Sequence, residues 1–199
     1  MAQKFVIPHS RPTIDESDLL SVSEVIRSGR IVQGEEVEKF EKKMAKFIGV
    51  HGAVATNTGT SSLHLSLLAI GIKKGDNVAM PSFVCTALLN AVKYVGAQPT
   101  LVDINPETYN IDISDLKKRI KRTTKAIILP HLFGLPADID EILSLGIPVI
   151  EDCAQAIGAV YKGGKTGSFG RLSCFSFYAT KVLSTGEGGM VVSDSKSLL

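Results

Sequence analysis

The sequence predicts an α/β fold in three layers, with a mostly parallel sheet of about seven strands between two layers of helices. Two observations carry this prediction. Short apolar runs alternate with longer helical patterns along most of the chain, and runs such as AIILP at 126–130 have the continuous apolar character of strands buried on both faces. The 199 residues, 44% of them hydrophobic, are enough for one such domain.

Apolar runs predict strands at 54–56, 78–80, 100–102, 126–129, 148–151, 173–177 and 189–193. Helical patterns follow at 60–70, 86–94, 114–121 and 138–145. The first part of the chain differs, because helical patterns at 16–28 and 35–47 have no strand between them. We therefore expect an N-terminal helical arm over residues 1–50 and a larger domain over residues 51–199. Ser193 or Asp194 is expected to cap one more helix, which would continue beyond the end of this chain.

Composition excludes several classes of protein. A net charge of +2 is too small for the basic surface of a nucleic-acid binder. Cys85, Cys153 and Cys174 are odd in number and far apart, so they predict neither a disulfide framework nor a zinc site, and they fit a reducing cytoplasm. The four histidines have no metal-ligand spacing, and no export signal or long apolar span is present. We expect a cytoplasmic protein with no metal, no nucleic acid and no membrane partner.

Chemically versatile residues follow three of the predicted strands, where α/β sheets bind ligands. The segment TGTSS at 58–62 opens a helix and suits a phosphate, or Thr58 is only the helix N-cap. Asp152 could hold a metal, a ribose hydroxyl or a protonated ring nitrogen, or could cap a helix. Lys181 could be a desolvated nucleophile toward carbonyls, or an ordinary surface lysine.

Two familiar nucleotide motifs are missing. The segment at 158–166 resembles a phosphate-binding P-loop but lacks one required glycine, because Ala159 occupies that position. No G-x-G-x-x-G follows the first predicted strand, so a dinucleotide-binding fold lacks its fingerprint.

Taken in order, several segments resemble the DegT/StrS-type sugar aminotransferases, which are pyridoxal-phosphate (PLP) enzymes of the aspartate aminotransferase fold type. The resemblance covers nearly the whole chain. It runs through SGRIVQGEEVEKFEKKMA, GTSSLHLSLLAIGIKKGDNV, PSFVCTALLNAVKYVGAQPTLVDINPETYNID, TKAIILPHLFGLPADID, PVIEDCAQAIGAVYKGGKTGSFG and CFSFYATKVLSTGEGGMVVSD. The last two segments are the most specific.

The resemblance implies two catalytic residues. Lys181 would form a Schiff base with the cofactor aldehyde and then move the proton between substrate carbon and cofactor. Asp152 would lie against the pyridine nitrogen and keep it protonated, which makes the ring an electron sink. The amino group would come from glutamate and pass to a keto sugar carried on a nucleotide diphosphate.

The resemblance also implies the residues that hold PLP. Gln155 would lie beside the ring and its phenolic oxygen, and Phe83 would stack on the ring face. Thr60, Ser61 and Ser176 would bind the phosphate, the first two of them at a helix N-terminus.

Two features of the chain, the lysine at position 181 and the short length, decide which members of the family it can be compared with. Some relatives carry histidine in place of the lysine and are sugar dehydratases, so Lys181 favours transamination. The family implies a homodimer and a chain nearly twice as long, with a small C-terminal domain that we expect to lie outside this chain. Two alternatives follow: a truncated or split-gene PLP-binding module without turnover of its own, or a regulatory protein that reuses the fold.

Overall fold

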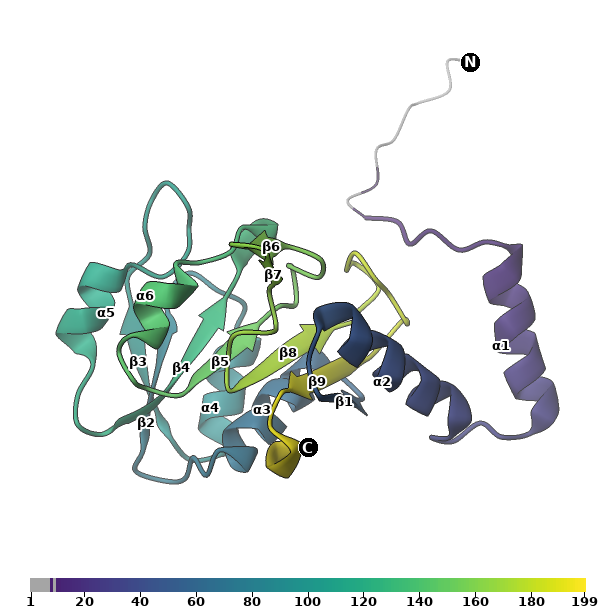
Figure 1. The fold of residues 1–199 in the computed structure, drawn as a ribbon, viewed down its shortest axis with the longest axis horizontal. Coiled ribbons are helices and arrows are strands. Elements are labelled where there is room, and N and C mark those ends of the chain that lie inside the picture. The colour runs from purple at the N-terminus through teal and green to yellow at the C-terminus, as the bar shows by residue number, and fades with distance from the viewer. Residues whose placement is uncertain (1–7, 9) are drawn as a thin grey trace, which may run out of the picture.

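The computed structural model describes residues 8 and 10–199, and its central feature is a seven-stranded sheet (Figure 1). The strands are β1 (Gly52–Thr56), β2 (Asn77–Pro81), β3 (Gln98–Val102), β4 (Thr124–Pro130), β5 (Val149–Asp152), β8 (Leu172–Ser176) and β9 (Gly189–Ser193). Their order in space is β1-β9-β8-β5-β4-β2-β3. β9 runs opposite to the other six strands, which all point the same way, so the prediction of a mostly parallel sheet of seven strands is confirmed.

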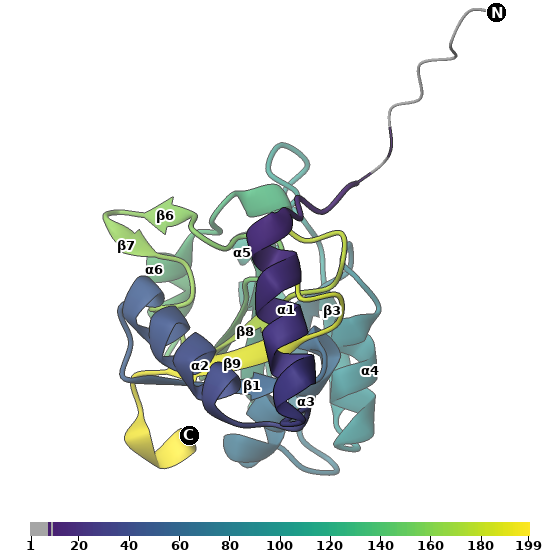
Figure 2. The ribbon, with the colours of Figure 1, turned by 90° about the vertical axis from the view of Figure 1, so that its right-hand side faces the viewer.

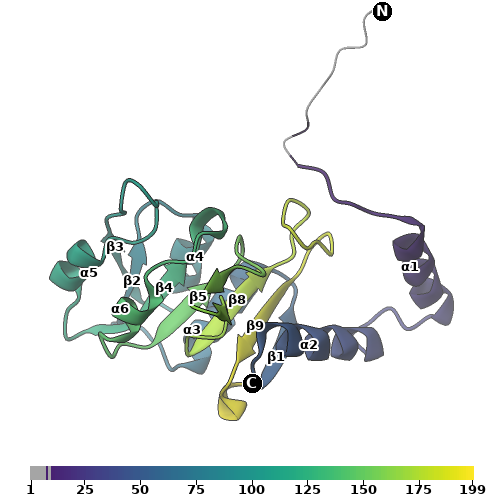
Figure 3. The same cartoon turned by 45° about the horizontal axis from the view of Figure 1, so that its top comes forward.

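Helices cover both faces of this sheet, which gives the predicted three layers (Figure 1). One face carries α3 (Gly59–Ala69) and α4 (Ala87–Tyr94), and the other carries α2 (Glu35–Ile48), α5 (Ile113–Arg119) and α6 (Ile139–Leu143). Side chains of a strand alternate between the two faces. Thus Ile128 of β4 packs in the core under α3 and α4, while Ile127 packs in the core under α5 and α6. Figure 3 shows α2 beside β9 and β1.

The first helix is the exception to this packing. α1 (Glu16–Ser28) begins with a capping box between Asp15 and Asp18 and ends at Gly29, whose φ of 71° is left-handed. None of its residues is buried, and it lies apart from the sheet in two views (Figures 1 and 3), while in Figure 2 it is seen in front of the sheet. α2, by contrast, buries Met44 and Ile48 against the sheet. The division of the chain at residue 50 stays a prediction.

Two details differ from the expected elements. Ser193 is the last residue of β9 and pairs with Gly52, and Asp194 accepts a hydrogen bond from the N–H of His51 at 2.9 Å. Neither residue caps a helix, so that expectation was wrong, and only a short 3₁₀ turn, η2 (Lys196–Leu198), follows. The hairpin of β6 (Val160–Tyr161) and β7 (Gly164–Lys165) was not predicted, because such short strands leave no alternating pattern. In the described part of the chain, no helix is long and apolar enough to cross a membrane.

Candidate active site

A cavity of about 380 Å³ opens at the carboxyl ends of β4, β5 and β8. β1 runs parallel to β8, because both are antiparallel to β9, so the helix that follows β1 also begins at this edge. The lining residues lie within five segments of the chain, at 58–63, 84–88, 130–132, 152–155 and 174–188, and not every residue of a segment faces the cavity. The predicted site residues Thr60, Asp152, Gln155, Ser176 and Lys181 are among them. The parallel sheet therefore brings together side chains that are up to 121 positions apart, from 60 to 181.

The N-terminus of α3 forms one wall of the cavity. Thr58 is its N-cap, since its Oγ1 atom accepts a hydrogen bond from the N–H of Ser61 at 3.0 Å. A Cβ atom at Gly59 would lie 2.8 Å from the Cβ of Ser176, so glycine lets the helix begin directly against the end of β8. The N–H groups of a first helical turn have no partner within the helix and carry the positive end of its dipole. Together with the hydroxyls of Thr60 and Ser176, they suit a phosphate.

Asp152, the last residue of β5, supplies a carboxylate to the cavity. The side chain is buried, and burial raises its pKa, although a hydrogen bond from the N–H of Ala154 to Oδ1 at 3.0 Å and the nearby charge of Lys181 act against the rise. A carboxylate with so little hydration is stabilised by a positively charged group placed beside it. The geometry thus favours a cationic partner, such as a protonated ring nitrogen, in the cavity.

Lys181 lies in the loop between β8 and β9 and is half-buried. The loop is tied to the end of β8, because Phe177 donates its N–H to the carbonyl of Gly188 and accepts one from Thr185, both at 2.9 Å. The amine is close enough to act on the pKa of Asp152, yet no ion pair joins the two side chains among the described residues. Lys181 is therefore available to react with a carbonyl group in the cavity.

Gln155 is fixed by the turn that follows β4. Its Oε1 atom accepts a hydrogen bond from the N–H of Phe133 at 2.9 Å, in the 3₁₀ turn η1 (Leu132–Gly134). With the carbonyl side of the amide occupied, the NH₂ side is left as a donor at the cavity.

Two of the predicted binding residues lie outside the lining of the cavity. Ser61 faces its own helix cap, where its Oγ atom accepts a hydrogen bond from Thr58 at 3.1 Å. Phe83 is 50% exposed, and its ring centroid lies 5.6 Å from that of Tyr109. Its neighbours Val84 and Cys85 do line the cavity. The roles assigned to all seven predicted binding and catalytic residues remain predictions.

A buried pair at the wall of the cavity was not predicted from the sequence: His131, which lines the cavity, and Glu151. The Nε2 atom of His131 lies 2.9 Å from Oε2 of Glu151, and both side chains are fully buried. Because Nδ1 of His131 accepts the N–H of Ala137, the ring proton is on Nε2 and is donated to the carboxylate. Burial acts to raise the pKa of Glu151, but hydrogen bonds from His131 and from the N–H groups of Gly167 and Gly170 outweigh it and hold the pKa low. The sequence feature that could have indicated this pair is Glu151 itself, a charged residue at the end of an apolar run.

His131 and Glu151 also come within 4.8 Å of the Cys153 thiol, a set of groups that could hold a metal. Both nitrogens of the imidazole are already used, and Glu151 accepts five hydrogen bonds, three of them from backbone N–H groups. Burial raises the pKa of the thiol well above its usual value, which disfavours the thiolate that binds metals. These contacts give the cluster a structural role.

The fold and the site define a class of protein, the PLP-dependent transferases of the aspartate aminotransferase type. Within this class, the chain belongs to the DegT/DnrJ/EryC1/StrS aminotransferase family, whose model matches residues 12–199. The resemblance seen in the sequence is thereby confirmed.

Individual relatives agree with this family. The chain is 43% identical over 197 residues to GDP-perosamine synthase of Escherichia coli O157:H7, covering 96% of this chain and 54% of that protein. The structure matches the putative sugar aminotransferase Spr1654 of Streptococcus pneumoniae, solved in its PLP form, with a TM-score of 0.93 at 29% identity, covering 98% of this chain and 55% of that one. It also matches GDP-4-keto-6-deoxymannose-3-dehydratase with bound GDP-perosamine, with a TM-score of 0.92 at 29% identity over 96% of this chain and 52% of that one. The chain thus spans about half the length of the relatives it matches.

Proposed function

We propose that this chain is the cofactor-binding domain of a PLP-dependent aminotransferase that moves an amino group from glutamate to a keto sugar linked to a nucleotide diphosphate. One observation carries the proposal: the amine of Lys181, the buried carboxylate of Asp152 and the N-terminus of α3 converge on one cavity. The names of the relatives, a GDP-perosamine synthase and a sugar aminotransferase, support a nucleotide-linked sugar as the acceptor.

The residues around the cavity fit PLP. Its phosphate matches the first turn of α3 with the hydroxyls of Thr60 and Ser176, its protonated pyridine nitrogen matches the poorly hydrated carboxylate of Asp152, and its aldehyde matches the amine of Lys181. The NH₂ group of Gln155, whose Oε1 atom is already bound by Phe133, would donate to an oxygen on the ring. Ser61 and Phe83 belong to the same proposal, as a phosphate-binding and a ring-stacking residue.

Each residue then has a chemical task. When bound, PLP supplies an electron-poor ring that stabilises negative charge on the reacting carbon of the substrate. Asp152 keeps the ring nitrogen protonated, since its carboxylate lacks water to stabilise it otherwise. Lys181 would hold the cofactor at its aldehyde end, and its amine would hold and move the proton of the substrate carbon.

A homodimer is part of this proposal. α1 has no buried residue, although it carries Leu19, Leu20, Val22 and Ile26, all more than half exposed. A second, open hollow of about 1350 Å³ separates α1 and the segment after it from the end of β1. An amphipathic helix whose apolar side chains are not covered by residues 8 and 10–199 suits docking against another chain, and we assign that place to a second copy. We also place the protein in the cytoplasm, because its three cysteines are free.

The cofactor assignment is tested by adding PLP to the purified chain, recording its visible absorption band, reducing with borohydride and mapping the modified peptide. We expect a phosphopyridoxyl group on Lys181, no labelling in Lys181→Ala, and normal labelling in Lys165→Ala. Lys165 is a suitable control because it too is half-buried, with its amine 4.7 Å from the centre of the Phe47 ring. Labelling that survives Lys181→Ala would contradict the assignment.

Turnover separates the proposal from a module that binds PLP without catalysis. The full-length parent protein is expected to consume glutamate in the presence of a nucleotide-linked keto sugar and to form an amino sugar. Cofactor uptake by the parent protein without amino transfer would favour the non-catalytic alternative.

A further inference from the structure

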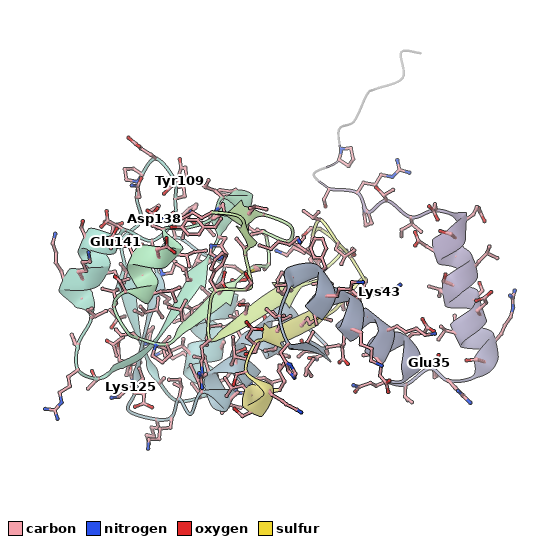
Figure 4. The ribbon with its side chains drawn as sticks, in the orientation of Figure 1. Glu35, Lys43, Tyr109, Lys125, Asp138 and Glu141 are labelled. Carbon is pink, nitrogen blue, oxygen red and sulfur yellow. The ribbon has the colours of Figure 1, made fainter. Side chains whose placement is uncertain are left out.

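Three aromatic side chains form an exposed surface at the edge of the sheet where the cavity opens. Phe83, Tyr109 and Phe133 are 50%, 44% and 70% exposed. They come from the loops that follow β2, β3 and β4, and Figure 4 labels Tyr109 in its loop. Tyr109 is the central member, with its ring centroid 5.6 Å from that of Phe83 and 6.1 Å from that of Phe133. We call this set the aromatic surface.

The backbone beneath the aromatic surface is strained and firmly held. Three non-glycine residues in the described chain have a left-handed φ, and two of them are Tyr109 at 60° and Phe133 at 56°. Such conformations cost free energy and persist only where surrounding contacts impose them, often beside a ligand site. The buried side chain of Asn110 supplies those contacts, because it accepts the N–H of Leu132 and donates to the carbonyl of Leu135, both at 3.0 Å.

The aromatic surface is continuous with the cavity. Phe133 follows Leu132, which lines the cavity, and its N–H is bound by Gln155, which lines it as well. The cavity, at about 380 Å³, lies near the lower end of the range for small-molecule sites, which is roughly 300–1000 Å³. PLP and a whole nucleotide-linked sugar would not both fit in a cavity of this size, so part of the nucleotide-linked sugar must lie outside it.

We propose that Tyr109 and Phe133 bind the nucleobase of the nucleotide-linked sugar by stacking. This inference rests on the proposed function and deepens it, because it places the non-reacting end of the acceptor. Aromatic faces bind the faces of bases, and rigid rings on a fixed backbone lose little conformational freedom on binding. Phe83, which lies next to Tyr109, would then stand between the bound base and the part of the site that holds the cofactor.

The test measures binding of guanosine diphosphate to the PLP-loaded chain by calorimetry, with inorganic pyrophosphate as the probe that lacks a base. Tyr109→Ala and Phe133→Ala should each weaken guanosine diphosphate binding roughly 5- to 150-fold and leave pyrophosphate binding unchanged. Tyr109→Phe should bind like the original chain, because the ring is kept. Tyr94→Ala and Phe47→Ala remove aromatic rings that are 63% and 45% exposed at other places on the molecule, and they should have no effect.

Three results would overturn the inference: unchanged guanosine diphosphate affinity in both alanine variants, equal losses for both probes, or loss of self-association without loss of affinity. The last result would assign the aromatic surface to a contact between two copies. Borohydride labelling of Lys181 in the same samples separates this inference from the proposed function. Labelling with unchanged affinity rejects only the aromatic site, whereas failure to label the original chain and the full-length parent protein rejects the cofactor assignment.

Discussion

His131 donates its Nε2 proton to the carboxylate of Glu151 at 2.9 Å, and this buried contact connects two segments that surround the cavity. The backbone N–H of His131 donates a hydrogen bond to the carbonyl oxygen of Asp152 at 3.2 Å. The carboxylate of Glu151 accepts further hydrogen bonds from the N–H groups of Gly167, Phe169 and Gly170. Glu151 and Asp152 are consecutive in β5, so their side chains point to opposite sides of the strand. One carboxylate therefore holds the scaffold together and the other faces the cavity.

We expect Glu151→Ala to lower the free energy of unfolding by about 3–5 kcal/mol, because it leaves several buried donors without an acceptor. Urea denaturation followed by circular dichroism measures this loss. Glu141→Ala is the control, since Glu141 is half exposed and its ion pair with Lys117 is worth at most about 1 kcal/mol. A similar small loss in both variants would show that the buried contact is not a major source of stability.

Asp152→Asn is expected to stabilise the chain without cofactor at neutral pH while weakening PLP binding. Burial raises the pKa of Asp152 in the folded chain, so the folded state favours the protonated form. Its ionisation therefore costs stability that grows as the pH rises from the ordinary value of 3.8 toward the raised pKa. Asparagine keeps an oxygen for the N–H of Ala154 and removes the charge.

The check is the free energy of unfolding of both proteins across the acidic range. The advantage of Asp152→Asn should vanish at pH values below 3.8, where the carboxyl group is protonated in both states. The low pKa of Glu151 acts in the opposite sense, since its stabilisation is present above the ordinary value of 4.5 and is lost as the pH falls through the folded value. A difference between the two proteins that is independent of pH would contradict the role of ionisation.

Thr58→Ala should cost about 1 kcal/mol, because it removes the side-chain cap of α3. It should also weaken PLP uptake, since the same helical turn is the proposed phosphate site. Thr86→Ala is a matched control: Thr86 precedes α4, but its side chain makes no capping hydrogen bond. Equal effects of the two substitutions on unfolding would show that the cap contributes nothing specific.

Gly189→Ala should destabilise the chain by about 1–3 kcal/mol or more, as overpacking does. A Cβ atom there would overlap the backbone carbonyl group of Thr58, which cannot move without shifting the start of α3. Thermal unfolding and PLP titration measure both consequences. At Gly34, where the nearest atom to a new Cβ is 3.8 Å away, alanine should be tolerated. If alanine were tolerated at Gly189 as well, the contact between β9 and the start of α3 would have room for an added methyl group.

Most of the fold could be predicted from the sequence, because the patterns that indicate strands and helices lie within short stretches of the chain. Buried parallel strands such as β4 consist of apolar residues, and the helices between them show regular spacing, so both appear in short windows. The hairpin of β6 and β7 is too short to leave such a pattern, and its position depends on neighbours distant in the chain. The helix expected at Ser193 failed because pairing with Gly52 extends β9 to that residue.

The candidate site was predicted from a family resemblance and not from local patterns. Individually, Thr58, Asp152 and Lys181 each had an ordinary structural explanation, and only their order in a family pattern favoured a common function. The sequence by itself determined the alternation of strands and helices, the chemistry of these side chains and the family. Tertiary structure alone decided that they share one cavity, that His131 and Glu151 are paired at its wall, and that Tyr109 and Phe133 lie together beside it. The physical reason is that these relationships depend on contacts between strand ends and loops far apart in the chain, which no short stretch of sequence contains.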